Sequence, residues 1–475
     1  MDKIKALFAP RDMSRGEPWK RIAEFAFPLL IGNFAQQLYN TVDAVVVGNS
    51  RWGYAALAAV GNASPVLNLL LALFVGISTG AGILVSQYFG ARDSEGLSRT
   101  IGNCITVTAL ASLFLMIVGP LSTGPLLRAV GTLESMYGPC KAYLDIFFIG
   151  IAGFFFYNIF AGVLRGLGDS FSALLYLMIT SVLNIFGDLL LVNSMGVAGV
   201  ALATVIAQGI SAVLCLRKLL SLKELFRIRR KDLRPDRGYL GRIVQLGVPS
   251  GLTQAIFSCA MMVVQRLINS FGDEMFIACN VMVMRVDGYA MLPNFSFGQA
   301  MSTFAGQNIG AKRLDRLKQG TRQGLLLSLG TALVLTPLVL LSGPALMRLF
   351  TPEKQLIDLS MSMMYILAAG YIAMAATQVL QGVMRGAGDT VTPMWISFGT
   401  TIAMRLPAAY GMVYLTRSMG ASLLTQEKMV FASLLAAWLL GTALSSAVYL
   451  RGGWKKKQVN ALAAELEAKA AEDTE

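Results

Sequence analysis

The chain has 475 residues, 55% of them hydrophobic and only 14% charged, and its formal net charge is +13. Soluble domains carry roughly 25% charged residues, and a single soluble core stops growing at about 250–300 residues. This composition excludes a soluble globular protein and a disordered chain. The apolar runs are long and continuous, whereas the strands of a membrane barrel alternate apolar and polar residues, so we do not expect a barrel. The chain contains no His, which excludes imidazole-based catalysis and His metal ligands.

Apolar runs long enough to cross a bilayer predict twelve transmembrane helices. They cover residues 22–47, 55–87, 99–119, 134–162, 171–192, 197–217, 243–268, 275–307, 322–342, 356–384, 391–415 and 428–450. If the N-terminus is cytoplasmic, 30 of the 40 Lys and Arg residues fall in segments on the cytoplasmic side, in keeping with the positive-inside rule. We therefore expect a multi-pass protein of the bacterial cytoplasmic (inner) membrane with both termini in the cytoplasm. Because this topology explains the basic residues, no nucleic-acid partner is expected.

An internal repeat divides the chain into two halves. Arg165–Asp169 (RGLGD) recurs 220 residues later as Arg385–Asp389 (RGAGD), and Gln87–Arg92 recurs at the same offset as Gln307–Lys312. Each half holds six spans, an even number, so the repeat is parallel. We expect an all-α protein with two pseudo-symmetric six-helix lobes around a central cavity, the architecture of an alternating-access transporter. The predicted divisions are a cytoplasmic N-terminus (1–21), an N-lobe (22–218), a basic cytoplasmic linker (219–242), a C-lobe (243–450) and a cytoplasmic tail (451–475).

The two R-G-x-G-D motifs are interpreted as tight cytoplasmic turns. Arg165 and Arg385 end a helix, where a positive charge complements the helix dipole. Both glycines of each motif are expected to allow a positive φ, and Asp169 and Asp389 are expected to cap the next helix. An additional gating role stays open.

Acidic residues inside the membrane are costly and therefore point to function. Asp43 and Asp188 each lie five residues from the outer end of a span, about 8 Å deep at the helical rise. Asn184 is one turn from Asp188, and Thr204 lies about 12 Å deep on the next span. These oxygen-bearing side chains favour a site for a proton shared between carboxylates or for Na⁺ as a hard cation. The alternative is a buried polar network that only fixes helix packing.

The first span also carries a polar stripe at helical spacing. Its members are Asn33, Gln36, Gln37 and Asn40. We interpret this stripe as facing a wet cavity, and a polar seam between helices is the alternative.

The C-lobe departs from this pattern. An offset of 220 takes Asp43, Asn184 and Asp188 to Val263, Met404 and Ala408, so the acids are not repeated. Instead, Arg285, Asp287 and Arg405 lie at roughly mid-depth on two spans. A structural ion pair of Asp287 with an arginine is one interpretation, and a substrate or gating role is the other.

The R-G-x-G-D turns, the Q-x-x-G-A-[RK] turns and the six-plus-six layout resemble the multidrug and toxic compound extrusion (MATE) family, in its MepA-like bacterial branch. The resemblance covers about residues 20–450. It implies an H⁺- or Na⁺-coupled antiporter that exports organic cations and contributes to antibiotic resistance. In that family the N-lobe site uses an Asp on the first span, an Asn-x-x-x-Asp pair on the fifth and a Thr on the sixth. These fall on Asp43, Asn184, Asp188 and Thr204.

Other function classes find less support in the residues. No Gly-Lys dipeptide occurs, so the chain has no P-loop. We expect a monomeric protein that is not an enzyme, needs no cofactor or metal besides the coupling ion, and handles small-molecule drugs within the lipid bilayer. The main alternative is a lipid or polysaccharide flippase of the same architecture. A flippase would need a cavity rich in Arg and Lys, for which only Arg285 and Arg405 are candidates.

Overall fold

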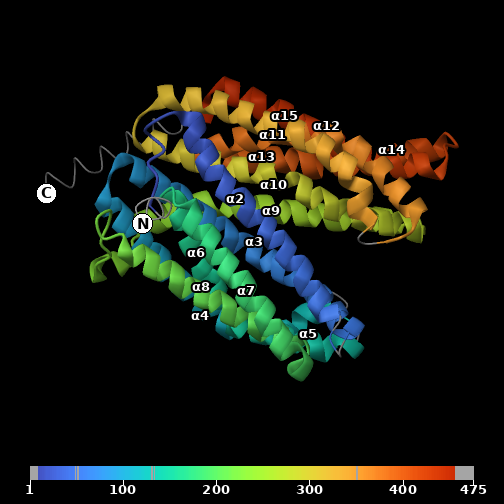
Figure 1. Cartoon of the computed structure of the whole chain (residues 1–475), viewed down its shortest axis with the longest axis horizontal. Coiled ribbons are helices and arrows are strands. Elements are labelled where there is room, and N and C mark those ends of the chain that lie inside the picture. The colour runs from blue at the N-terminus through green and yellow to red at the C-terminus, as the bar shows by residue number, and fades with distance from the viewer. Residues whose placement is uncertain are drawn as a thin grey trace. The chain divides into compact units, whose positions relative to one another are not determined.

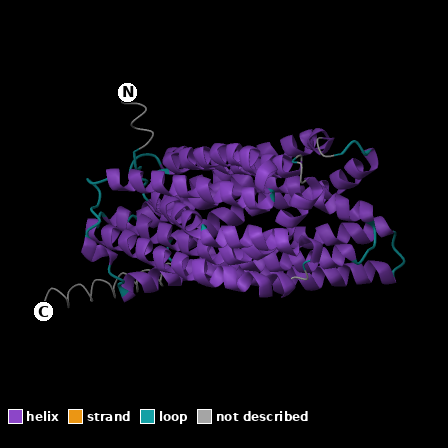
Figure 2. Cartoon of the chain, turned by 90° about the horizontal axis from the view of Figure 1, so that it is seen from below, coloured by secondary structure: helices purple, strands orange, loops and turns teal. Residues whose placement is uncertain are grey.

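The computed structural model describes residues 9–48, 50, 53–129, 132, 134–348 and 351–454. Within these ranges all regular structure is helical (Figure 2). The elements, labelled in Figure 1 where there is room, are α2 (Pro18–Gly48), α3 (Gly53–Ala91), α4 (Ser94–Ala129), α5 (Glu134–Ile149), α6 (Ile151–Gly166), α7 (Ser170–Met195), α8 (Val197–Ser221), η1 (Arg230–Leu233), α9 (Arg237–Asn269), α10 (Glu274–Gly310), α11 (Leu314–Arg348), α12 (Lys354–Gly386), α13 (Val391–Phe398), η2 (Gly399–Met404), α14 (Arg405–Ser418) and α15 (Leu423–Arg451).

Each of the twelve predicted spans falls on one helix or on a short run of helices. The span predicted at 134–162 is α5 followed by α6, which meet at a 53° bend, and the span at 391–415 is α13, η2 and α14. Among the described residues nine helices are long and apolar enough to cross a membrane, or ten with the bent pair. α2 and the α13–α14 run fall outside this count. The prediction of an all-α polytopic protein is confirmed, while residues 455–475 of the predicted tail lie outside the description.

The chain forms two compact units, and two of the three boundaries between them fall inside the first helix of a repeat. One unit comprises Met1–Asp12 and Phe27–Gly251, and the other comprises Met13–Ala26 and Leu252–Glu475. The predicted linker 219–242 thus belongs to the first unit. The helices α2 and α9 each change unit close to their internal prolines, Pro28 and Pro249.

The segments that precede these two helices are held in equivalent ways, by a backbone amide that donates to the side-chain oxygen of an Asn or Gln. In the first unit, the Asp236 amide donates to Asn103 Oδ1 at 2.8 Å on α4. In the second, the buried Met13 amide donates to Gln307 Oε1 at 2.7 Å, and its carbonyl accepts from Arg316 Nε at 3.2 Å. The start of each repeat is therefore held by hydrogen bonds to helices of the other repeat.

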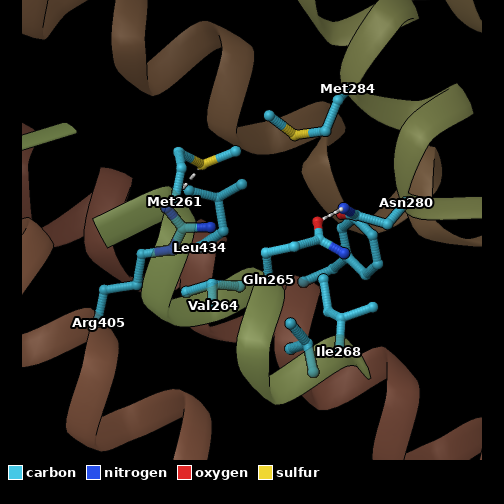
Figure 3. Close-up of a pocket in the computed structure, with 10 residues that line it drawn as sticks. Met261, Val264, Gln265, Ile268, Asn280, Met284, Arg405 and Leu434 are labelled. Atoms are coloured by element: carbon cyan, nitrogen blue, oxygen red, sulfur yellow. Dashed lines mark hydrogen bonds between the residues drawn. The ribbon is translucent and has the colours of Figure 1, made fainter. Parts of the chain in front are cut away.

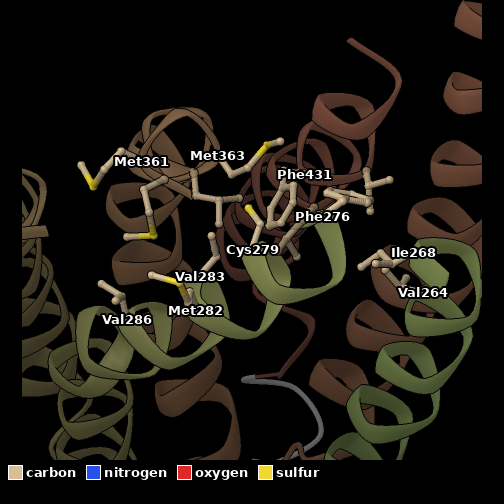
Figure 4. Close-up of a cluster of buried hydrophobic side chains, with 14 of the residues drawn as sticks. Val264, Ile268, Phe276, Cys279, Met282, Val283, Val286, Met361, Met363 and Phe431 are labelled. Atoms are coloured by element: carbon tan, nitrogen blue, oxygen red, sulfur yellow. The ribbon is translucent and has the colours of Figure 1, made fainter. Parts of the chain in front are cut away.

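The core of the second unit is rich in Met and aromatic side chains. Phe276, Cys279 and Met282 of α10 pack with Met363 of α12 and Phe431 of α15 (Figure 4). Flexible thioethers fill irregular gaps of this kind, so these methionines serve helix packing.

Helix contact in the first unit relies on paired glycines. A Cβ at Gly76 of α3 would overlap the backbone of Gly251 in α9, and one at Gly80 would lie 2.6 Å from the Gly247 nitrogen. The two backbones can touch only because neither side has a Cβ. This contact holds the first half of α9 against α3.

Candidate functional site

The N-lobe site is centred on Asp188 of α7, whose side chain is fully buried. One turn earlier, Asn184 Nδ2 lies 3.5 Å from Asp188 Oδ1 and donates to Thr204 Oγ1 on α8 at 3.2 Å. The Thr204 hydroxyl in turn donates to the Val200 carbonyl of its own helix at 3.0 Å. The Asn-x-x-x-Asp spacing thus places both polar groups on one face of α7, against the hydroxyl of α8.

Asp43 of α2 completes this group. Its half-buried carboxyl group interacts electrostatically with the carboxyl group of Asp188. The structure therefore brings together all four residues that the sequence singled out, from α2, α7 and α8.

Three buried oxygens of this group have no hydrogen-bond partner among the residues that the structure describes. They are Asp43 Oδ1, Asn184 Oδ1 and Asp188 Oδ2. Unsatisfied oxygens in a low dielectric are costly, and a bound cation or proton would relieve that cost. Among the described residues no three His, Cys, Asp or Glu side chains are grouped to hold a metal ion, so a cation here would rely on two carboxylates together with amide and hydroxyl oxygens.

Sequence reasoning missed two tyrosines at this site. Tyr39 of α2 interacts electrostatically with Asp43 and Asp188. Tyr143 of α5 is also within electrostatic range of both acids. Tyr39 precedes Asp43 by one helical turn, a spacing that could have identified it. Nothing local in the sequence connects Tyr143 with α2 and α7.

The polar stripe of α2 is only partly described. Asn33 and Gln37 are half-buried and Gln36 is exposed. The side chain of Asn40 lies outside the description. That the stripe faces a wet cavity remains a prediction.

The intramembrane charges of the C-lobe separate into two groups. Arg285 is exposed on α10, whereas Arg405 is 4% exposed on α14. Asp287 lies within electrostatic range of Arg405 and of Tyr371, whose hydroxyl donates to Met364 Sδ at 3.5 Å. No nitrogen–oxygen contact of 4.0 Å or less joins Arg405 to Asp287 in the described part of the chain, and Arg405 Nε and Asp287 Oδ1 are both left without a hydrogen-bond partner.

A π-helical turn changes the alignment of the two repeats. The turn η2 contains Gly399–Met404, and the Arg405 amide donates to the Thr400 carbonyl, five residues back. A π-turn accommodates one extra residue in a helix. Accordingly the buried positions of α7, Asn184 and Asp188, correspond to the buried Arg405 and Ala409 at an offset of 221. The assignment to Met404 and Ala408 by the offset of 220 is therefore corrected by one residue.

The R-G-x-G-D turns have the expected shape, but their two glycines are required for different reasons: the second has a positive φ, and the first allows close helix packing. Gly168 and Gly388 have positive φ values of 84° and 91°. The first glycines, Gly166 and Gly386, are helical and allow close packing. A Cβ at Gly166 would lie 2.5 Å from the Gly82 carbonyl oxygen, and one at Gly386 would overlap the backbone of Ser302. The expectation of positive φ at both glycines of each motif was thus wrong for the first.

The acids of these turns bind the start of the next helix. Asp169 accepts from the Ser172 amide at 2.9 Å, and Asp389 accepts from the Thr392 amide at 3.2 Å. Lys218 lies 3.7 Å from Asp169. The arginines Arg165 and Arg385 are half-buried at the ends of α6 and α12.

Comparisons with known proteins agree with this architecture. The sequence model of the MatE family matches twice, at residues 28–190 and 249–410. The chain is 30% identical over 459 residues to the probable multidrug resistance protein YoeA of Bacillus subtilis, covering 94% of this chain and 97% of that protein. It is 25% identical to the probable multidrug resistance protein NorM of Thermotoga maritima, covering 93% and 94%.

Solved structures share the fold. A crystal structure of MATE in complex with MaL6 superimposes with a TM-score of 0.86 at 22% identity, covering 94% of this chain and 99% of that one. A transporter of the MOP superfamily from Pyrococcus furiosus, described as having a binding pocket of reverse polarity, gives 0.84 at 23% identity, covering 94% and 98%. The double match across both repeats, together with the shared fold, places this chain in the MatE family of membrane transporters.

Proposed function

We propose that the protein is a cation-coupled antiporter that exports organic, mainly cationic, drugs by alternating access, with H⁺ as the coupling ion. The names of the relatives, multidrug resistance proteins of two bacteria, support drug export. The observation that carries the coupling is that Asp43 and Asp188 interact electrostatically while each keeps one buried carboxyl oxygen without a hydrogen-bond partner among the described residues.

Two ionised carboxylates that interact in a low dielectric repel each other, so the pair favours a state in which one of them carries a proton. Asp188 is fully buried, which further disfavours a second negative charge beside the first. Uptake of a proton would neutralise the pair, and its release would restore a negative charge that attracts a cationic substrate. The proton and a cationic substrate then compete for the same negative charge. Binding of one favours release of the other, which results in exchange.

Na⁺ is the other cation that this oxygen set could hold, because the three unpartnered oxygens belong to carboxylates and an amide. The experiment therefore imposes the two gradients separately. Purified protein in proteoliposomes is given a pH gradient or a Na⁺ gradient, and movement of ethidium is followed by fluorescence. We expect a pH gradient to drive ethidium transport and a Na⁺ gradient alone to be ineffective.

Asp188→Asn should fold and should abolish gradient-driven transport, because Asn cannot exchange a proton. Asp145→Asn is the matched control, since Asp145 forms an ion pair with Lys141 on α5 and takes no part in the site. Full transport by Asp188→Asn would refute the coupling site. Failure of the wild-type protein to move ethidium under either gradient would refute the antiport of organic cations.

A further inference from the structure

A small pocket in the second unit is lined by one buried cation and by neutral side chains (Figure 3). Its walls come from α9, α10, α14 and α15, and none of the residues that line it is acidic. The polar groups are Gln265, Asn280 and Arg405, and the thioethers of Met261 and Met284 lie beside them.

The guanidinium of Arg405 is poorly satisfied there. Its Nη1 donates to Met261 Sδ at 3.7 Å, and its Nε has no partner. A thioether is a weak acceptor. The neighbouring Gln265 Oε1 already accepts from Asn280 Nδ2 at 3.0 Å. A guanidinium that is only 4% exposed and has no carboxylate within ion-pair distance in the described ranges is costly to bury unless an anion joins it.

The pocket lies at the position in the second repeat that corresponds to the N-lobe site in the first. Pro28 and Pro249 define an offset of 221 for the first helix of each half, and the π-turn gives the same offset for α7 and α14. At this offset Asp43 corresponds to Val264, a residue of the pocket wall, and Asn184 corresponds to Arg405. The counterpart of the first unit's acidic group thus contains no acid, and it carries a cation in place of the amide of Asn184.

We propose that this pocket is an anion subsite in which Arg405 binds the carboxylate of amphoteric substrates, which carry a cationic group and a carboxylate on an aromatic body. The proposal rests on the proposed drug transport and names one substrate class for it. A guanidinium pairs with both oxygens of a carboxylate, and Met261 and Met284 offer adaptable contacts to an aromatic ring.

The test uses two dyes that differ by one methyl group. Rhodamine 110 has a free carboxylate, and rhodamine 123 is its methyl ester. Binding to the purified full chain in nanodiscs is measured by fluorescence anisotropy. Arg405→Gln should weaken rhodamine 110 by about tenfold or more, the usual effect of losing a hydrogen bond to a charged group, and leave rhodamine 123 unchanged. Arg405→Lys should recover part of the loss. Arg417→Ala, which removes an exposed arginine of the same helix, should change neither dye.

A second variant tests the positive charge of Arg405 by removing a nearby negative charge instead of the arginine. Asp287→Asn removes a negative charge within electrostatic range of Arg405, so it should bind rhodamine 110 more tightly than the wild type. This arm remains decisive if Arg405→Gln fails to fold. Unchanged or weaker binding of rhodamine 110 by Asp287→Asn, or equal losses of both dyes in Arg405→Gln, would overturn the proposal.

Two further measurements separate the alternatives. If benzoate alone binds in an Arg405-dependent way while rhodamine 110 binding is indifferent to Arg405, the pocket holds a free anion and the substrate assignment is wrong. Gradient-driven transport of rhodamine 123 by the wild type tests the proposed function without involving Arg405. A failure of that transport with intact Arg405-dependent binding of rhodamine 110 would refute antiport and leave the subsite standing.

Discussion

At the residue scale, the chemistry of the first unit depends on side chains whose helices are far apart in sequence. Asp43 and Asp188 were identifiable from their depth and from the absence of a basic partner on their own helices. Tyr39 and Tyr143 lie within electrostatic range of the same acids, and a tyrosine hydroxyl group can donate to a carboxylate.

We expect Tyr39→Phe to reduce gradient-driven ethidium transport by about fivefold, because it removes a hydroxyl that can donate to the acids when their charge changes, an interaction worth ~1 kcal/mol, and keeps the ring. Folding should be unaffected, as judged by size-exclusion chromatography. Tyr414→Phe, at an exposed position of α14, is the control. Wild-type transport by Tyr39→Phe would show that this hydroxyl takes no part in the site.

The turn glycines allow a second residue-scale prediction. Gly168→Ala and Gly388→Ala should each destabilise the protein by about 1–2 kcal/mol, because a Cβ is strained at positive φ. Gly209→Ala, in α8 with open space around it, should be neutral or slightly stabilising. Thermal unfolding followed by the loss of the monodisperse chromatographic peak measures the difference. Equal melting temperatures for Gly168→Ala and Gly209→Ala would contradict the conclusion that the turn needs a glycine at position 168 because of its positive φ.

At the scale of elements, the π-turn η2 decides which residue of the second repeat takes the buried position that Asn184 has in the first repeat. The turn absorbs one residue, so Arg405 is buried where the strict repeat would place Met404. If the same residues formed a regular α-helix with none deleted, the guanidinium would be rotated by about 100° around the helix axis, since an α-helix has 3.6 residues per turn.

A deletion tests the role of the turn. Removing the exposed Ala403 should convert the π-turn to regular α-helix and leave Arg405 at its buried position, so the variant should fold and keep its Arg405-dependent dye binding. Removing the exposed Val182 from the regular helix α7 rotates Asn184 and Asp188 away from their partners, so that variant should lose folded yield and transport. Loss of folding in the Ala403 deletion alone would show that η2 is needed for stability.

At the scale of the whole molecule, the arrangement of basic residues predicts sidedness, and the two units define how the chain is divided. Each first helix begins in one unit and continues in the other, with the change beside Pro28 or Pro249. A proline inside a helix removes a hydrogen bond and permits bending. We expect the conformational change of transport to use these two positions.

Cysteine labelling tests the predicted topology. In a background in which the exposed Cys259 is replaced, Lys312→Cys and Arg230→Cys should react with an impermeant maleimide only after the cells are permeabilised. Arg417→Cys should react in intact cells. Labelling of Lys312→Cys from outside would reject the assignment of the cytoplasmic side.

The sequence by itself determined the elements that depend on local composition. Hydropathy located the spans, since about 20 apolar residues suffice to cross a bilayer, and the repeated RGxGD motif predicted the turns that Gly168 and Asp169 form. Asp43, Asn184, Asp188 and Thr204 were predictable because depth along a helix follows from residue count.

Only the tertiary structure decided what depends on register and on contacts between helices. The offset of 221 at Arg405 arises from a π-turn whose residues have no distinctive composition. The helical glycines Gly166 and Gly386 are explained by neighbouring backbones, and Tyr143 reaches the acids from a different helix. These features follow from packing between segments distant in sequence, because a shift of one residue around a helix moves a side chain to a different face while the local hydropathy stays the same.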